Sequence, residues 1–344
     1  MNILSSLQHK VRKELTLHKS IVLGGLLFAM VFSSAANALN ITVSIPPLAG
    51  MIKPLLSDDD HIEVLLKPGA SPHGFQLKPS NIKTLKESDL VLWVGTPVDH
   101  WMKKPLQNIT VPKQSLLSVP DVEQLAIRQG GLWERKKHHH DEDEDEHEHE
   151  HEHEHESSHN SEMSQMDGHI WMSFNNAQSF IKVVSDQLQL LKPQQAKIIQ
   201  QKTQDWLLQL AMVDLKIQSQ LTPVKDVPYM VLHDAFHYFS NRYNLNGIGS
   251  IQLNPTISPS LKRVAELREK IKQGDVRCVF KEPQFPAKRV YAVTKNLKVK
   301  VGSLDPIGLV SKEYQQKNSA DYLPYDVFLE QLSNQFYDCL SQTK

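Results

Sequence analysis

The chain has 344 residues, with 38 basic and 39 acidic side chains and a formal net charge of −1 at pH 7. This length suits two domains better than one, and the near balance of charge gives no case for nucleic-acid binding. The acidic charge is concentrated in one segment, because residues 141–156 carry eleven acidic side chains and no basic one.

The first 38 residues are typical of a secretory signal. Four basic side chains precede an apolar run over residues 21–32, and Ala36-Asn37-Ala38 then offers a small-x-small cleavage site. The apolar run is shorter than the roughly 20 residues that a transmembrane helix needs, and an uncleaved anchor is the alternative. We therefore expect a signal peptide over residues 1–38, cleaved near Ala38, and an exported mature chain.

Strands and helices alternate after this signal. Residues 41–45, 62–66 and 90–94 are short apolar runs rich in β-branched side chains, which predict strands. Ser80 is predicted to cap a helix that runs to Glu87. The alternation is typical of an α/β fold with loops at the strand ends.

A histidine-rich, acidic tract follows. Residues 129–166 have too few apolar side chains to order themselves, so we expect a disordered insert in the first lobe. Imidazoles beside carboxylates bind metal ions, and many near-equivalent arrangements imply weak sites. The alternative is a charged linker without a metal role. The expected low-affinity ligands are His138, His139, His140, His147, His149, His151, His153 and His155.

A long helix is predicted after the insert. Residues 194–220 contain no Gly or Pro and carry apolar side chains at helical spacing, and Pro193 occupies a tolerated first-turn position. A helix of about 27 residues spans about 40 Å. We expect this rigid helix, over residues 193–222, to join an N-terminal lobe over residues 39–192 to a C-terminal lobe over residues 223–344.

The second half repeats the α/β pattern. Strands are predicted over residues 229–232, 276–280 and 299–304. Helices are predicted over residues 235–243, 260–272 and 328–340, and the last two carry an apolar stripe. These elements predict a second α/β lobe.

The two cysteines, Cys278 and Cys339, are an isolated pair in a chain that we expect to be exported. That setting favours a disulfide. Two buried free thiols are the alternative, and a thiolate metal site is disfavoured because no second cysteine pair completes it.

Three histidines stand apart from the tract. His73 lies in a Gly-Pro loop, His169 lies between the tract and a predicted helix, and His233 ends a predicted strand. Loops at strand ends are where α/β folds place ligands, and three imidazoles with an open fourth position form a zinc site. A lone loop histidine is more often structural or exposed, so spacing alone leaves both interpretations open.

The motifs around these histidines resemble one family. They are Pro68-Gly-Ala-Ser-Pro-His73, Leu77-x-Pro-Ser80, Leu90-Val-Leu-Trp93-Val-Gly, His169-Ile-Trp-Met-Ser, His233-Asp-Ala-Phe, Cys278-Val-Phe-Lys-Glu-Pro-Gln284-Phe and Leu304-Asp305-Pro-Ile-Gly308. Over residues 40–344 the chain resembles the cluster A-I metal-binding proteins of ABC importers, and most of all their zinc-binding members. The acidic, histidine-rich insert is typical of those members.

The resemblance implies two α/β lobes joined by a long rigid helix, with the metal site in the cleft between the lobes. It implies that His73, His169 and His233 hold Zn²⁺ in the periplasm for delivery to an ABC permease subunit with its cytoplasmic ATPase. Manganese-binding relatives have a glutamate at the position of His233, and three imidazoles favour Zn²⁺ over the harder Mn²⁺. We expect a monomer that is not an enzyme.

The fourth ligand is open. Pro72 stands where some zinc-binding relatives have a glutamate, so it cannot supply a ligand. Asp305 matches an aspartate that is a metal ligand in several relatives, and we expect it to bind the metal weakly or to orient a ligand histidine. His237, one helical turn after His233, is a further candidate, with aromatic packing as its alternative role.

Two other functions are weighed against import. A zinc hydrolase would use the open coordination position for a reactive water, but the motifs lack the glutamate of a His-Glu-x-x-His helix. The second alternative is a metal-buffering or adhesive surface protein that works without a transporter.

Overall fold

The computed structural model describes residues 38–133, 166–252 and 254–341. Its first lobe is built on a parallel sheet with the strand order β2-β1-β3-β4. The strands are β1 (Asn40–Val43), β2 (His61–Val64), β3 (Leu90–Trp93) and β4 (Lys113–Ser115). Its helices are α2 (Pro46–Ile52), α3 (Pro79–Lys86) and α4 (Lys103–Gln107), with 3-10 turns at Lys53–Leu55, Pro72–Gly74 and His100–Met102.

The second lobe repeats this topology. A parallel sheet has the strand order β6-β5-β7-β8. The strands are β5 (Tyr229–Val231), β6 (Gly247–Ser250), β7 (Cys278–Lys281) and β8 (Lys300–Ser303). Its helices are α8 (His237–Arg242), α9 (Leu261–Lys272), α10 (Lys288–Thr294), α11 (Lys312–Asn318) and α12 (Tyr325–Ser341). In both sheets the strand order reverses at the first strand of the lobe, and ligands of such folds bind beyond the carboxyl ends of the strands.

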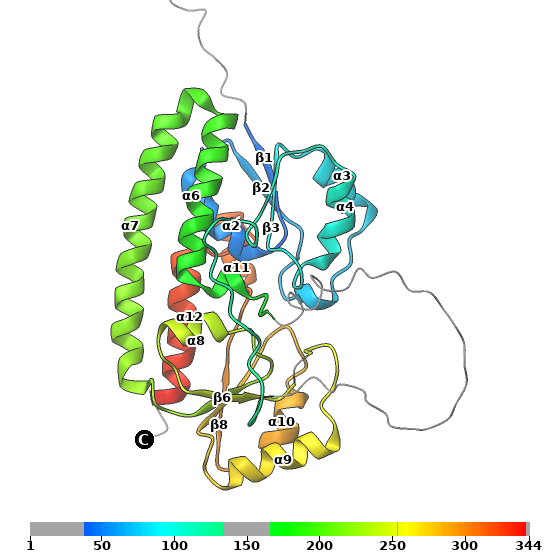
Figure 1. Cartoon of the computed structure of the whole chain (residues 1–344), viewed down its shortest axis with the longest axis vertical. Helices are drawn as coiled ribbons and strands as arrows, with labels where there is room; N and C mark the ends of the chain where they lie inside the picture. Colours follow the sequence, from blue (N-terminus) through cyan, green and yellow to red (C-terminus); the bar gives the residue numbers. More distant parts are fainter. Residues whose placement is uncertain (1–37, 134–165, 253, 342–344) are drawn as a thin grey trace, which may run out of the picture. The chain divides into compact units, whose positions relative to one another are not determined.

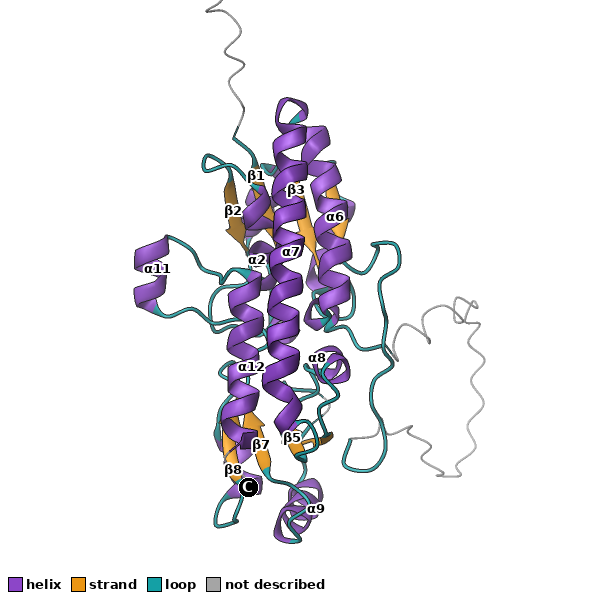
Figure 2. Cartoon of the chain, turned by 90° about the vertical axis from the view of Figure 1, so that its left-hand side faces the viewer, coloured by secondary structure: helices purple, strands orange, loops and turns teal. Residues whose placement is uncertain are grey.

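Three long helices pack in a row, and one of them runs along both lobes. Helix α6 (Phe174–Leu191) and helix α7 (Ala196–Leu221) form a hairpin, and α7 then packs beside α12. Figure 2 shows α7 between α6 and α12, and Figure 1 shows α7 running alongside both sheets. The expected long helix is thus confirmed, although it pairs with neighbouring helices along its length instead of crossing the gap alone.

The apolar core is continuous from one lobe to the other. One cluster of buried side chains contains Val43 of β1, Phe180 of α6, Trp206 of α7 and Phe336 of α12. Helix α12 also contacts α2 of the first lobe. There Gly50 is required, because a Cβ at this position would lie 2.2 Å from the carbonyl oxygen of Leu323.

Two local predictions were wrong. Ser80 does not cap α3, which begins one residue earlier at Pro79 with Lys78 as its N-cap. The insert was expected to begin at residue 129, but residues 129–133 make defined contacts. Leu132 pairs with Gly249 at the edge of β6, and its carbonyl accepts a hydrogen bond from the backbone N–H of Ser250 at 3.2 Å. The histidine-rich tract and the signal segment lie outside the described residues.

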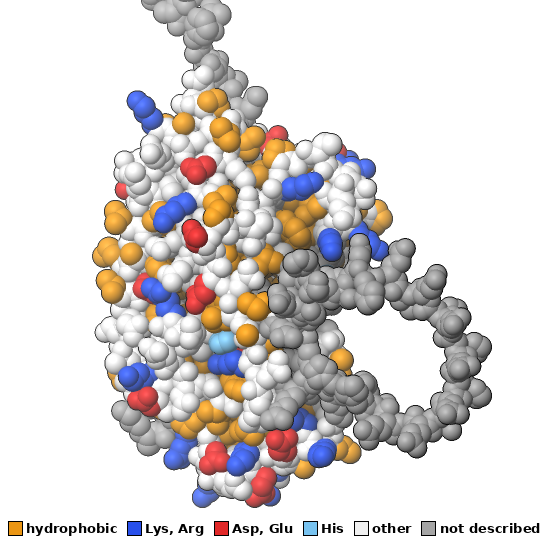
Figure 3. Space-filling model, in the orientation of Figure 1, with side chains coloured by type: hydrophobic (Ala, Val, Ile, Leu, Met, Phe, Trp, Pro, Cys, Tyr) orange, Lys and Arg blue, Asp and Glu red, His pale blue; other side chains and the backbone are white. Residues whose placement is uncertain are grey.

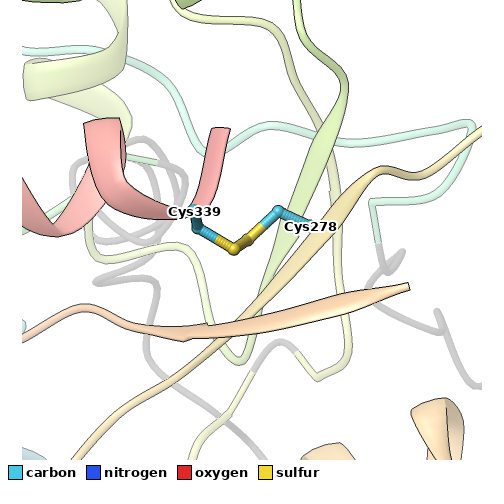
Figure 4. Close-up of a disulfide and its surroundings, with 2 residues drawn as sticks. All are labelled: Cys278 and Cys339. Carbon is cyan, nitrogen blue, oxygen red and sulfur yellow. A yellow bond between two sulfur atoms is a disulfide. The ribbon is translucent and has the colours of Figure 1, made fainter. Parts of the chain in front are cut away.

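The disulfide is confirmed. Cys278 at the start of β7 is bonded to Cys339 near the end of α12, with the two Cα atoms 6.2 Å apart (Figure 4). Because β7 is an inner strand of its sheet, the bond ties the closing helix directly to the centre of the second lobe.

The surface has no large single-sign region on the face that Figure 3 shows, where acidic and basic side chains are interspersed. Within the described residues, no helix combines the length and apolar character that crossing a bilayer requires.

Candidate metal centre

Three histidine rings meet between the lobes. Each of His73, His169 and His233 offers one ring nitrogen, and these nitrogens all lie within 4.8 Å of one another. The Nε2 atom of His169 lies 3.2 Å from Nε2 of His73 and 3.3 Å from Nε2 of His233. Among the described residues, these three are the only group of three or more histidine, cysteine or acidic side chains so arranged.

The spacing of these nitrogens fits a tetrahedral ion. With Zn–N bonds of 2.0–2.1 Å, two ligands of a tetrahedral zinc ion lie about 3.3 Å apart. The two Nε2 separations, 3.2 and 3.3 Å, agree with that value. The arrangement can therefore take one Zn²⁺ with little movement of the rings, and three ligands leave a fourth position open.

His73 is positioned by the loop that follows β2. The loop ends in the 3-10 turn Pro72–Gly74, where the hydroxyl of Ser71 accepts a hydrogen bond from the backbone N–H of His73. The indole N–H of Trp101 donates to the carbonyl of Pro72 at 3.0 Å, which fixes the turn against the first lobe. The ring of His73 is consequently held at the carboxyl end of the first sheet.

His169 is positioned by the turn before α6. Its backbone N–H and its Nδ1 both lie within hydrogen-bond distance of Oδ1 of Asp167, at 3.0 and 2.7 Å. Gly168 between them is required, because a Cβ there would lie 2.8 Å from Pro97 and Val98. Two residues later, the indole of Trp171 donates to the carbonyl of Pro306, which anchors the turn to the second lobe.

His233 follows β5, and its ring is oriented from the adjacent strand. Glu282 follows β7, and its Oε1 lies 2.7 Å from Nδ1 of His233 and 3.2 Å from its backbone nitrogen. Because β5 and β7 are neighbouring parallel strands, their carboxyl ends bring these two residues together. Both side chains are almost completely buried.

The two carboxylates orient the ligand atoms. A histidine that donates Nδ1–H to a carboxylate presents an unprotonated Nε2 to the metal, and the contact raises its basicity. Asp167 serves His169 in this way and Glu282 serves His233. Neither carboxylate was assigned a role from the sequence, although Glu282 stands in one of the quoted motifs. Their signal was a carboxylate two residues before one histidine and another at the end of a neighbouring parallel strand.

Burial and neighbouring charges shift the pKa values of His73 and His169 in different directions. Burial lowers the pKa of His73 well below its usual range, and the nearby rings of His169 and His233 lower it further. Burial also acts to lower the pKa of His169, but the charge and hydrogen bond of Asp167 outweigh it, so this pKa is raised. His73 is thus neutral at neutral pH and able to bind a metal.

A pocket of about 230 Å³ adjoins the three rings. It is lined by residues of both lobes, among them Pro97 and Val98 of the first lobe and Asp234 and Pro255 of the second. The exposed His100 lies at the same pocket. The site is therefore reached from solvent through a cleft between the lobes.

Asp305 does not join the three rings in this structure. Its Oδ1 accepts hydrogen bonds from the Gln284 amide at 2.7 Å and from the backbone N–H of Ile307 at 3.1 Å, and its Oδ2 accepts from the N–H of Leu309. Asp305 also makes no described hydrogen bond to a ligand histidine; that role belongs to Asp167 and Glu282. Its carboxylate holds the loop after β8.

His237 points to a neighbouring carboxylate. Its Nδ1 lies 3.7 Å from Oδ2 of Asp167, and it is not part of the group of three rings. Its ring also packs near that of Tyr238, with the ring centres 6.2 Å apart. The structure therefore places His237 behind the site, with no direct place among the three ligands.

We expect Glu282→Gln to weaken zinc binding by roughly 10–100-fold, because the amide cannot hold His233 as a carboxylate does. Asp305→Ala is the comparison, since that carboxylate contacts its own loop, and its loss should be smaller. Competitive titration with a zinc chelator measures both. Equal losses of zinc affinity in the two variants would indicate that Asp305 itself takes part in zinc binding.

The chain is similar to named zinc-uptake proteins. It is 34% identical over 332 residues to the high-affinity zinc uptake system protein ZnuA of Yersinia pestis, covering 96% of this chain and 99% of that protein. It is 36% identical over 310 residues to the protein of the same name from Haemophilus ducreyi, covering 90% and 96%. A crystal structure of a zinc-bound ZnuA deletion mutant shares the fold, with a TM-score of 0.67, 20% identity, and 88% and 98% of the two chains covered.

The family comparison agrees with these relatives. Residues 41–324 match the family described as zinc-uptake complex component A, periplasmic (ZnuA). The matched residues include both sheets, the helices between them and all three histidines of the cluster. The chain therefore belongs to the ZnuA family.

Proposed function

We propose that this protein captures Zn²⁺ in the periplasm and delivers it to the membrane permease of an ABC importer. The observation that carries the proposal is the group of three ring nitrogens, two of whose separations match those expected for a tetrahedral zinc ion. The relatives named as high-affinity zinc uptake proteins support the same cargo.

We propose His73, His169 and His233 as the zinc ligands, with the fourth position left to a water or another exchangeable group. Imidazole nitrogens favour Zn²⁺ over Mn²⁺ because Mn²⁺ prefers carboxylate and water oxygens. An open position suits a carrier, since an incoming ligand can bind the ion before the protein has released it. Asp305 acts on this site through the loop after β8.

The remaining expectations follow from this role. We propose cleavage of the signal near Ala38, a monomeric carrier with lobes over residues 39–192 and 223–344, and docking on a permease that works with a cytoplasmic ATPase.

Gene deletion tests the transport role. A strain without the protein should grow poorly when a chelator makes zinc scarce and should recover when zinc is added. Normal growth under chelation would favour a metal-buffering protein instead.

The histidine-rich tract should be separable from the cleft. Deleting residues 138–156 should lower the number of zinc ions bound per chain while leaving one tightly bound ion, because the three ligand histidines lie outside the tract. Metal analysis with competitive titration of the mature protein checks this. If the deletion variant no longer binds one zinc ion tightly, the primary zinc site lies in the tract and not at the three histidines.

A further inference from the structure

Residues 125–133, which we call the crossing segment, leave the first lobe and pack on the second (Figure 1). At one end, the backbone N–H of Leu125 donates to the hydroxyl of Tyr238 at 2.9 Å. At the other end, Leu132 pairs with Gly249 at the edge of β6. Gly249 is required there, because a Cβ would lie 2.5 Å from Leu132. The segment is therefore fixed on both sides of Arg128.

Arg128 makes a two-pronged ion pair with Asp234. Its Nε donates to Oδ2 at 2.7 Å, and its Nη2 donates to Oδ1. The guanidinium lies 3.9 Å from the centre of the Trp133 ring. The side chains of Arg128 and Asp234 are only 18% and 11% exposed. Both carboxylate oxygens are thus occupied by one immobilised cation.

Asp234 adjoins the three-histidine site. It directly follows the ligand His233 in the chain, and it lines the same pocket as the three histidine rings. Its negative charge also acts on the ring of His169. Asp234 is therefore a carboxylate at the pocket, on the same loop as a ligand histidine.

We propose that Arg128 determines the metal specificity of the site by holding the Asp234 carboxylate away from the ion, so that the protein ligands remain three nitrogens. The inference rests on the proposed zinc-carrier function and extends it to a residue outside the site. The described contacts of Arg128 are with Asp234 and Trp133 and include no ligand histidine. Arg128 is a positioning residue that acts through Asp234.

The physical reason is that Zn²⁺ and Mn²⁺ prefer different ligand atoms. Carboxylate oxygens suit Mn²⁺, whereas imidazole suits Zn²⁺. Without Arg128, the mostly buried Asp234 carboxylate would lack a counter-charge, and an unpaired buried charge is costly. A divalent ion bound beside the pocket could replace that counter-charge, and the carboxylate would then add an oxygen to the three protein nitrogens.

The test compares Zn²⁺ and Mn²⁺ affinities of the full mature protein with and without Arg128. We expect Arg128→Ala to reduce the ratio of zinc to manganese affinity by roughly 10–100-fold, the size of effect usual for residues behind the ligands. Co²⁺ reports the geometry independently. Its visible absorption bands should shift in Arg128→Ala, because a carboxylate oxygen would take the exchangeable fourth position beside the three nitrogens.

Two further variants separate specificity from general damage. Arg128→Ala combined with Asp234→Asn removes both the cation and the carboxylate, and it should restore the wild-type metal ratio and Co²⁺ spectrum. Arg242→Ala is the matched control. It breaks a similar two-pronged pair with Asp214 on α7, and neither residue lines the pocket at the three rings, so it should lower stability without changing the ratio or the spectrum.

The outcomes are distinguishable from failure of the proposed function. If wild-type protein binds no zinc at the three histidines, the carrier proposal itself fails. If wild-type protein binds zinc there, but Arg128→Ala keeps the wild-type ratio and spectrum, the role of Arg128 is overturned. A changed ratio that persists in the double variant would also overturn it, because the effect would not pass through Asp234.

Discussion

Replacing His169 with alanine should weaken zinc binding more than any other single substitution. Its Nε2 is the atom that approaches both other rings, at 3.2 and 3.3 Å. The substitution removes one of three nitrogen ligands and leaves the buried Asp167 without its ring partner. We expect a loss of more than about 100-fold, beyond the range for residues behind the ligands. Competitive titration measures it.

His61→Ala is the matched control for this prediction. Its side chain is 67% exposed on the edge strand β2, and it has no place in the group of three rings. Zinc affinity should stay at the wild-type value in this variant. If folded His169→Ala protein binds zinc with wild-type affinity, the three-histidine cluster is not the metal site.

Removing the disulfide should lower the free energy of unfolding by about 4 kcal/mol in the chain-entropy description. The bond joins residues 61 positions apart, and so restricts a long loop of the unfolded chain. Replacing Cys278 and Cys339 together with alanine and following unfolding in urea measures the effect. Zinc affinity should change little, because both cysteines lie at the opposite end of β7 and α12 from the ligand loops.

Reduction of the wild-type protein supplies an independent check. With a reductant present, its unfolding midpoint should approach that of the double variant, whereas the double variant should not respond. A loss below about 1 kcal/mol, well under the usual range, would mean that the loop is already restricted in the unfolded chain.

The sequence predicted the strands that are apolar and buried, because a central parallel strand leaves an unbroken apolar run. Residues 90–94 and 229–232 were found in this way. Strand β4, which reads Lys-Gln-Ser, and strand β6, which reads Gly-Ile-Gly-Ser, were not predicted. Both are edge strands, which pair with another strand on one side only. Their sequences therefore lack the unbroken apolar run of a central parallel strand.

The three histidines could be selected from the sequence because each lies at a loop beside a predicted strand or helix. Their partners could not be selected in the same way. Glu282 reaches His233 only because β7 is placed beside β5, and that neighbourhood depends on the strand order of the sheet. The pairing of Arg128 with Asp234 spans 106 residues and depends on how the crossing segment packs.

The shared core of the two lobes has a mechanical consequence. Helices α7 and α12 pack against elements of both lobes, and buried side chains from β1 to α12 form one cluster. A hinge needs a connection that bends without disturbing packed side chains, and no described element between these lobes meets that condition. In the proposed carrier role, binding and release of an ion would therefore depend on movement of the short segments that bear the three rings. Release to a permease would displace one of those segments and would not require the lobes to separate.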